Sequence, residues 1–174
     1  MTKMLTRAGR AAILDRKAFT EAFFDGDAAA DGAIIVALVG ATTYLGTLLR
    51  LGAFDFFTIG ELFRWVIAAV VSWLILALAT WFAASRLFGS TNRPQTMIAM
   101  HGLAPFPLVL EIFGGLVGGL ALIWYLVILV LATQEASDLK MRDAAVSVLI
   151  GFAAAVLLRA LMGVPFVVFG GLFG

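Results

Sequence analysis

The segment Leu62–Ala84 reads LFRWVIAAVVSWLILALATWFAA, and it decides the fold class because it carries no carboxylate and almost only apolar side chains. A second segment of this kind, Gly114–Thr133, reads GGLVGGLALIWYLVILVLAT. About twenty helical residues, rising about 1.5 Å each, cross a hydrocarbon core of roughly 30 Å. Both segments are therefore predicted to be transmembrane helices, and the chain to be an all-α polytopic membrane protein.

Three further apolar blocks complete a prediction of five transmembrane helices joined by short loops. The clearest loops are Ser85–Thr96 and Gln134–Asp143, whereas only glycines mark the boundary between the third and fourth spans. That weak boundary leaves open an alternative in which residues 97–133 form one broken or re-entrant element. The predicted spans are Gly32–Phe54, Leu62–Ala84, Met97–Phe113, Gly114–Thr133 and Ala144–Gly170.

The composition argues against several classes of function. Of the 174 residues, 63% are hydrophobic and 13% are charged, whereas soluble domains hold about a quarter charged residues. The net charge of +1 gives no basis for binding nucleic acid, and the absence of cysteine removes disulfides, thiolate metal sites and thiol nucleophiles. Motifs of zinc proteases, serine hydrolases and nucleotide-binding loops are missing. We expect no enzymatic activity, no cofactor and no metal.

Residues 1–31 are predicted to form a cytoplasmic amphipathic segment that precedes a transmembrane domain over residues 32–174. One helix with about 100° per residue separates an apolar face from a charged face. The apolar face holds Met4, Leu5, Ala8, Ala12, Phe19, Ala22 and Phe23, and the charged face holds Lys3, Arg7, Arg10, Lys17 and Glu21. Such a helix suits an anionic lipid surface, with Lys3, Arg7, Arg10 and Lys17 at the membrane. The alternative is a helix docked on the protein's own cytoplasmic loops.

The distribution of basic residues predicts the orientation. Lys and Arg concentrate before the first span, after the second and after the fourth, which lie on one side of the membrane if there are five spans. The positive-inside rule then places the N-terminus in the cytoplasm and the C-terminus outside. We expect no cleaved signal peptide, because no apolar region with a small-residue cleavage site follows the basic N-terminus.

Four ionisable residues form a candidate intramembrane polar network: Arg64, His101, Glu111 and Arg159. Such groups are costly within hydrocarbon, so they pair or line a cavity. On straight helices Glu111 lies about 21 Å into the third span and Arg159 about 22 Å into the fifth. These depths predict a Glu111–Arg159 pair, which Arg64 could join. The pair is interpreted either as an ion pair that fixes helix register or as a substrate or proton site.

His101, with no carboxylate within one helical turn, does not predict a metal site. It is interpreted either as a hydrogen-bonded histidine near the cytoplasmic interface or as a proton relay. Pro105 and Pro107 remove backbone donors, so the third span should bend or break there. That break either only bends the helix or shapes a ligand pocket.

The glycines Gly114, Gly115, Gly118 and Gly119 form two overlapping G-x-x-x-G spacings. This spacing removes side chains from one helix face and lets another backbone approach closely. The motif predicts helix packing within the protein or, alternatively, oligomerisation.

Several local features resemble the bacterial branch of the Yip1 family of membrane proteins, over about Ala11–Gly170. They are Gly102–Pro105, Ile123–Tyr125 and the loop ending in Arg142–Ala144, together with the five-span topology. The resemblance implies an integral protein of a bacterial inner membrane without an assigned activity. Eukaryotic members act in vesicle trafficking through Rab-type GTPases, but their Asp-Leu-Tyr-Gly-Pro signature is missing here, so GTPase binding is not carried over.

These features favour a non-catalytic membrane protein that organises or assists a partner membrane complex. The expected partners are membrane lipid and either another membrane protein or a second copy of the chain. The alternative is a small transporter or channel that uses His101, Glu111 and Arg159. An intramembrane enzyme has the least support, because it would need a polar cluster around His101.

Overall fold

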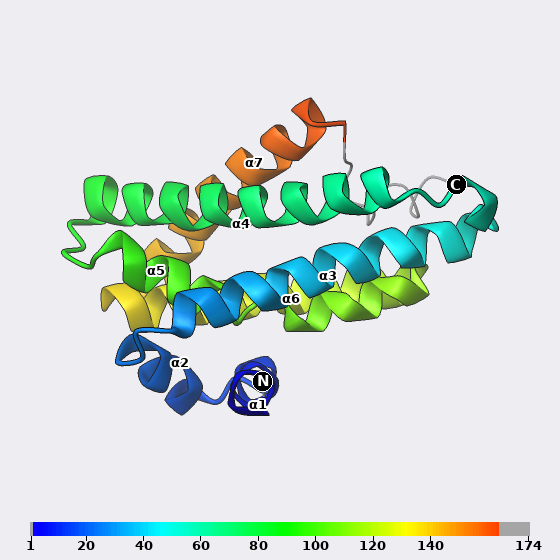
Figure 1. Ribbon diagram of the computed structural model, residues 1–174. Helices are drawn as coiled ribbons and strands as arrows, with labels where there is room; N and C mark the ends of the chain where they lie inside the picture. Colours follow the sequence, from blue (N-terminus) through cyan, green and yellow to red (C-terminus); the bar gives the residue numbers. More distant parts are fainter. Residues whose placement is uncertain (1, 164–174) are drawn as a thin grey trace.

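The computed structural model describes residues 2–163, and all regular structure in that range is helical (Figure 1). Five stretches are long and apolar enough to cross a membrane, which confirms the all-α, five-span prediction. They are α3 (Ala28–Leu51), α4 (Ile59–Phe88), Pro94–Phe113, α6 (Gly115–Ser137) and α7 (Met141–Leu161). The last residues of the predicted fifth span, 164–170, lie outside the described range.

Local signals in the sequence explain where the long helices begin and end. The Thr58 hydroxyl accepts a hydrogen bond from the backbone N–H of Glu61 at 3.1 Å, so it caps the first turn of α4. Gly52 directly follows α3 and Gly89 directly follows α4, and both have positive φ (60° and 71°). Glycine adopts this left-handed conformation without the steric cost of a Cβ. The turn between α3 and α4 contains the short 3₁₀ helix η1 (Phe54–Phe56).

The third span is broken, as Pro105 and Pro107 predict, so the depth of Glu111 estimated on a straight helix does not apply. Helix α5 (Pro94–His101) ends after two turns, and the chain continues through Gly102–Pro105 into the 3₁₀ helix η2 (Phe106–Phe113). Pro105 and Pro107 cannot donate to the preceding turn, so the α-helical hydrogen bonds stop there. The fourth span, α6, nevertheless follows as a separate full-length helix.

Two short helices, not one, precede the bundle: α1 (Thr2–Ala12) and α2 (Arg16–Phe23). The chain turns between them at Leu14, which has φ 61°, and the Asp15 carboxylate caps α2 by accepting from the Lys17 N–H at 3.0 Å. In Figure 1 α1 is seen nearly end-on, while α3, α4 and α6 run across the view. The apolar side of this hairpin is buried against the protein, at Met4, Ala8, Ala11, Phe19 and Ala22.

The end of α1 lies beside the middle of α6. The indole Nε1 of Trp124, nine residues after the start of α6 at Gly115, donates to the carbonyl of Ala12 at 2.7 Å. Docking on the protein itself, the alternative considered for this segment, is therefore what the structure shows. The surface on which the segment docks is not the cytoplasmic loops of that alternative, because α1 and α2 contact α5, η2 and α6.

Glycines do bring helices together, but they are mostly not those of the predicted motif. A Cβ on Gly32 of α3 would lie 2.7 Å from the Cα of Gly102, and one on Gly40 would lie 2.8 Å from the Ala69 Cβ on α4. On α7, a Cβ at Gly151 would overlap the Thr80 hydroxyl of α4. Each glycine therefore permits a backbone approach that alanine would block.

The predicted glycine motif has a different role. Gly114 and Gly115 have φ values of 62° and 49° and form the turn into α6, and Gly118 lies against the Cα of Glu111. Gly119 has no described atom within 4 Å of the place where its Cβ would be. Gly115 and Gly119 face open space among the described residues, so for them packing within the protein is not seen and oligomerisation, the other alternative, stays a prediction.

Candidate functional site: a buried polar cluster

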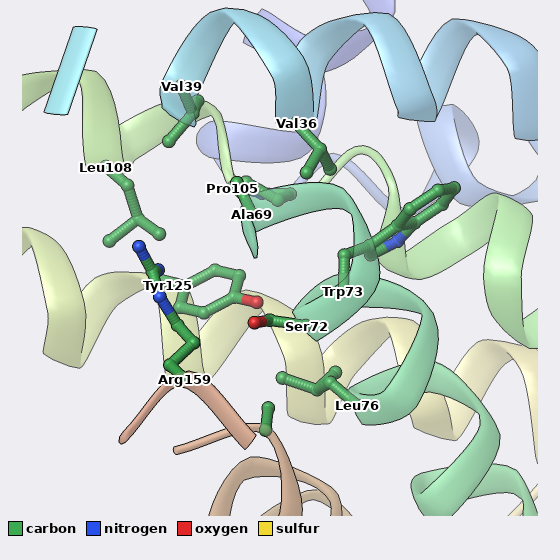
Figure 2. Close-up of a pocket in the computed structure, with 11 residues that line it drawn as sticks. Val36, Val39, Ala69, Ser72, Trp73, Leu76, Pro105, Leu108, Tyr125 and Arg159 are labelled. Carbon is green, nitrogen blue, oxygen red and sulfur yellow. The ribbon is translucent and has the colours of Figure 1, made fainter. Parts of the chain in front are cut away.

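The five spans converge on a small cavity in the centre of the bundle (Figure 2). The space open to the centres of water molecules is about 40 Å³. Its walls are mostly apolar, and Ser72 of α4, Tyr125 of α6 and Arg159 of α7 supply polar groups. All three side chains are buried, with exposed fractions of 4%, 4% and 8%. The site thus joins helices that are far apart in the sequence.

Glu111 lies next to this cavity, near the end of η2. It is 5% exposed, and its charge attracts the Arg159 guanidinium from across the core. The Thr43 hydroxyl lies 2.8 Å from the Val39 carbonyl and 3.3 Å from Glu111 Oε2, so its one proton is shared between the two acceptors. The structure therefore brings Glu111 and Arg159 into one region, and their direct contact stays a prediction.

Arg50 holds the backbone of η2 from the rim of the cluster. Its Nη1 donates to the carbonyl oxygens of Glu111 and Ile112, the second at 3.1 Å. The Glu111 carbonyl also accepts from the backbone N–H of Gly114 at 2.9 Å, and the guanidinium adds charge-assisted hydrogen bonds to it and to the Ile112 carbonyl. Arg50 thereby ties the end of α3 to the segment that carries Glu111.

Arg64 and His101 lie outside the cluster. The Arg64 guanidinium is 46% exposed and pairs with Glu61 at 2.7 Å, which corrects the suggestion that it joins Glu111 and Arg159. The ring of His101 is fully buried, and its Nε2 lies 2.9 Å from the Thr133 hydroxyl. That hydroxyl donates to the Leu129 carbonyl, so Nε2–H is the donor to Thr133. His101 is thus a hydrogen-bonded histidine, as one of its two interpretations expected.

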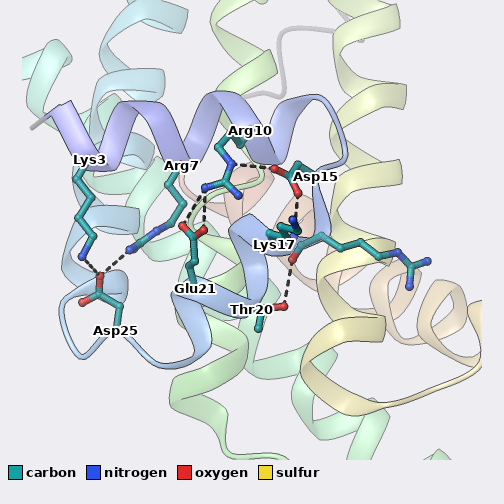
Figure 3. Close-up of polar contacts among 9 residues, drawn as sticks. Lys3, Arg7, Arg10, Asp15, Lys17, Thr20, Glu21 and Asp25 are labelled. Carbon is teal, nitrogen blue, oxygen red and sulfur yellow. Dashed lines mark hydrogen bonds and ion pairs between the residues drawn. The ribbon is translucent and has the colours of Figure 1, made fainter.

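A second polar cluster neutralises the basic face of α1 (Figure 3). Asp25 Oδ2 lies 2.9 Å from Lys3 Nζ and 2.6 Å from Arg7 Nη2, while Arg10 pairs with Asp15 and Glu21, both at 2.8 Å. The hydrogen bonds from Arg7 and then Lys3 lower the pKa of Asp25. The bond from Arg10 lowers the pKa of Asp15 in the same way.

This arrangement corrects the predicted membrane-surface role of Arg7. Its side chain is 2% exposed and bonded to Asp25, so it cannot reach lipid headgroups. Lys3 and Arg10 are more exposed but are also paired with carboxylates of the same chain. Lys17 is exposed, in agreement with a surface position.

Thr43, Arg50, Ser72 and Tyr125 belong to the cluster and were not selected from the sequence. The position of Tyr125 in the sequence does indicate a special role. Tyrosine favours the membrane interfaces, whereas Tyr125 lies in the middle of a span. Hydroxyls such as Thr43 and Ser72 are common in spans and usually bond to their own helix, so their spacing carried no signal.

Comparison of the chain with protein-family models, with curated proteins and with solved structures found no match.

Proposed function

We propose that this protein is a non-catalytic membrane component that organises or assists a partner membrane complex. The observation that carries the proposal is the open glycine face of α6. Gly115 and Gly119 have no described atom within 4 Å of their Cβ positions, and the exposed side chains of Leu116, Leu120 and Ile123 flank them. Exposed small residues at this spacing allow a second transmembrane helix to approach closely.

The small size of the central cavity also supports this proposal. Metabolite pockets usually measure about 300–1,000 Å³, far more than the 40 Å³ found here. The Glu111 carboxylate lies within hydrogen-bond distance of the Thr43 hydroxyl, and the basic residues Lys3, Arg7 and Arg10 are paired with carboxylates of the same chain. The proposal places the chain in a bacterial inner membrane, with a cytoplasmic N-terminus and an external C-terminus. The resemblance to the Yip1 family belongs to the same proposal.

Photo-crosslinking in native membranes tests the proposed contact on α6. A crosslinking amino acid at Leu120 should form one discrete adduct with another membrane protein, and Gly119→Leu should abolish it without unfolding the protein. The same probe at Ile67, exposed on α4, is the matched control and should report lipid. If Leu120 forms adducts with lipid alone, the proposal is contradicted. If the only protein adduct is with a second copy of the chain, the contact on α6 belongs to a homo-oligomer and not to a complex with a different protein.

A small transporter or channel is the second candidate, favoured by the break in the third span. Gly102–Pro105 interrupts that span beside the buried groups Glu111 and Arg159, and broken helices near charged residues occur in transporters. Liposomes containing the purified protein would show ion or proton flux that Glu111→Gln abolishes. Flux at the level of protein-free liposomes would contradict this candidate.

A further inference from the structure

Ser72, like Thr80, differs from three other hydroxyls buried in the bundle core. Thr43, Thr133 and Ser147 each donate to the carbonyl four residues earlier in their own helix, at 2.8–2.9 Å. The Ser72 Oγ has no hydrogen-bond partner among the described residues, although it is buried. It lines the central cavity instead. A buried hydroxyl without a partner costs free energy, so a group inside the cavity is expected to satisfy it.

Tyr125 and Arg159 present further polar groups to the same space. Figure 2 shows the hydroxyls of Tyr125 and Ser72 pointing toward one another, while Arg159 lies along the Tyr125 ring. The three side chains come from α6, α4 and α7. A ligand there can thus accept from a guanidinium and exchange hydrogen bonds with two hydroxyls.

We propose that the cavity is a binding site for ordered water that bridges Ser72, Tyr125 and Arg159. One water needs about 10–15 Å³ of such space and two to four polar partners, so 40 Å³ accommodates about three or four molecules. Purely apolar cavities of larger size stay dry, but this one carries three polar side chains. The inference does not depend on the proposed partner complex, because it concerns the centre of the bundle and not the outer face of α6.

The site occupies the place where the broken third span meets the other helices. Pro105 and Leu108, from the turn and from η2, form part of its wall. Bound water would therefore link α4, α6 and α7 by hydrogen bonds next to the one span that lacks continuous α-helical bonds. In this position it stabilises the packing of the bundle core.

The effect of Ser72→Ala on thermal stability tests the proposal by its sign. If water is bound, the variant removes a bridge and the Tm in detergent should fall by about 2–4 °C. If the cavity is dry, the variant removes an unsatisfied hydroxyl, and the Tm should rise or stay unchanged. Ser147→Ala is the matched control, because Ser147 is equally buried but bonds to the Asp143 carbonyl. A raised or unchanged Tm for Ser72→Ala would overturn the proposal.

A second measurement uses the unsubstituted protein. Radiolysis of bound water by an X-ray pulse creates hydroxyl radicals that oxidise adjacent side chains, including tyrosine. The chain has two tyrosines, Tyr44 and Tyr125, each 4% exposed, and Tyr125 alone lines the cavity. Tyr125 should be oxidised several-fold faster than Tyr44, and Ser72→Ala should reduce the difference. Equal or slower oxidation of Tyr125 would show that the cavity holds no water.

Discussion

At the scale of single residues, the contact between Gly32 and Gly102 shows how one hydrogen atom in place of a methyl group sets the spacing of two elements. A Cβ on Gly102 would lie 2.5 Å from the Cα of Gly32, which is backbone and cannot rotate away. On α6, by contrast, a Cβ at Gly119 would have no described atom within 4 Å. The same substitution therefore has different consequences at the two glycines.

We predict that Gly32→Ala lowers the free energy of unfolding by about 1–3 kcal/mol, the usual cost of overpacking a core. Gly119→Ala should leave it unchanged or raise it slightly, because alanine favours helix over glycine. Chemical or thermal unfolding in detergent measures both effects. A Gly32→Ala variant as stable as Gly119→Ala would show that α3 and the broken span are further apart than described.

Glu111 and Arg159 carry the second prediction at this scale. Removing one member of a buried charge pair costs about 3–5 kcal/mol, because the other charge then lies buried without it. Glu111→Ala should therefore destabilise the protein, and adding Arg159→Ala should recover part of the loss. Unfolding of the two single variants and the double variant in detergent gives the coupling. Effects that simply add would show that the two residues do not interact.

At the scale of elements, the α1–α2 hairpin shows that an amphipathic pattern does not reveal which surface it covers. The apolar residues Met4, Ala8 and Phe19 are buried as the pattern requires, but they are buried against protein. The basic residues Lys3, Arg7 and Arg10 face carboxylates of α2 and its ends rather than lipid headgroups. Charge pairing within the chain thus competes with attraction to the membrane.

The lowered pKa values of Asp25 and Asp15 predict that acid releases the hairpin. In the unfolded chain these carboxylates have a pKa of about 3.9, so their pairing stabilises the docked hairpin above that pH. The contribution is lost as the pH falls through the lower folded-state pKa. In a variant that keeps only Trp124 of the four tryptophans, its emission should change below about pH 4.

Asp25→Asn is the control for this acid response. It removes the carboxylate that joins Lys3 and Arg7, so the hairpin should be looser at neutral pH and less sensitive to acid. An acid response as large as in the unsubstituted hairpin would show that Asp25 does not contribute.

At the scale of the whole molecule, the odd number of spans determines that the two ends of the membrane domain lie on opposite sides. The loops after α4 and α6 and helix α2 lie near one end of the bundle in Figure 1, and the α3–α4 turn lies at the other. Helix α1 lies beside the middle of the bundle. Arg86, Arg93, Lys140 and Arg142 lie in or beside the loops at the first of these ends.

We therefore predict the activity of topology reporters in a bacterial host. A periplasm-active enzyme fused after Thr91 should be inactive, and one fused after Asp55 or Gly174 should be active. Gly174 lies outside the described residues, so its fusion tests the side reached by the complete fifth span. The reverse pattern, or activity at all three positions, would contradict the five-span orientation.

The sequence by itself determined that the fold is that of a membrane protein, and it determined the approximate position of each span. Runs such as Leu62–Ala84 suffice for this, because hydrophobicity, helix length and glycine or proline breaks are properties of a local segment. The break near Pro105 and the burial of Glu111 and Arg159 were predictable for the same reason. The sequence left two interpretations of α1 open, because an amphipathic helix can bury its apolar face either in a lipid surface or against the protein itself.

Only the tertiary structure decided which helix faces meet. It selected Gly32, Gly40 and Gly151 for close contacts, turned Gly119 outward, paired Arg64 with Glu61, and aimed Ser72 at Tyr125. These outcomes depend on how far each helix is rotated about its axis and where the third span breaks. Packing between segments far apart in the chain sets both quantities, and the hydrophobicity of any one segment does not encode them.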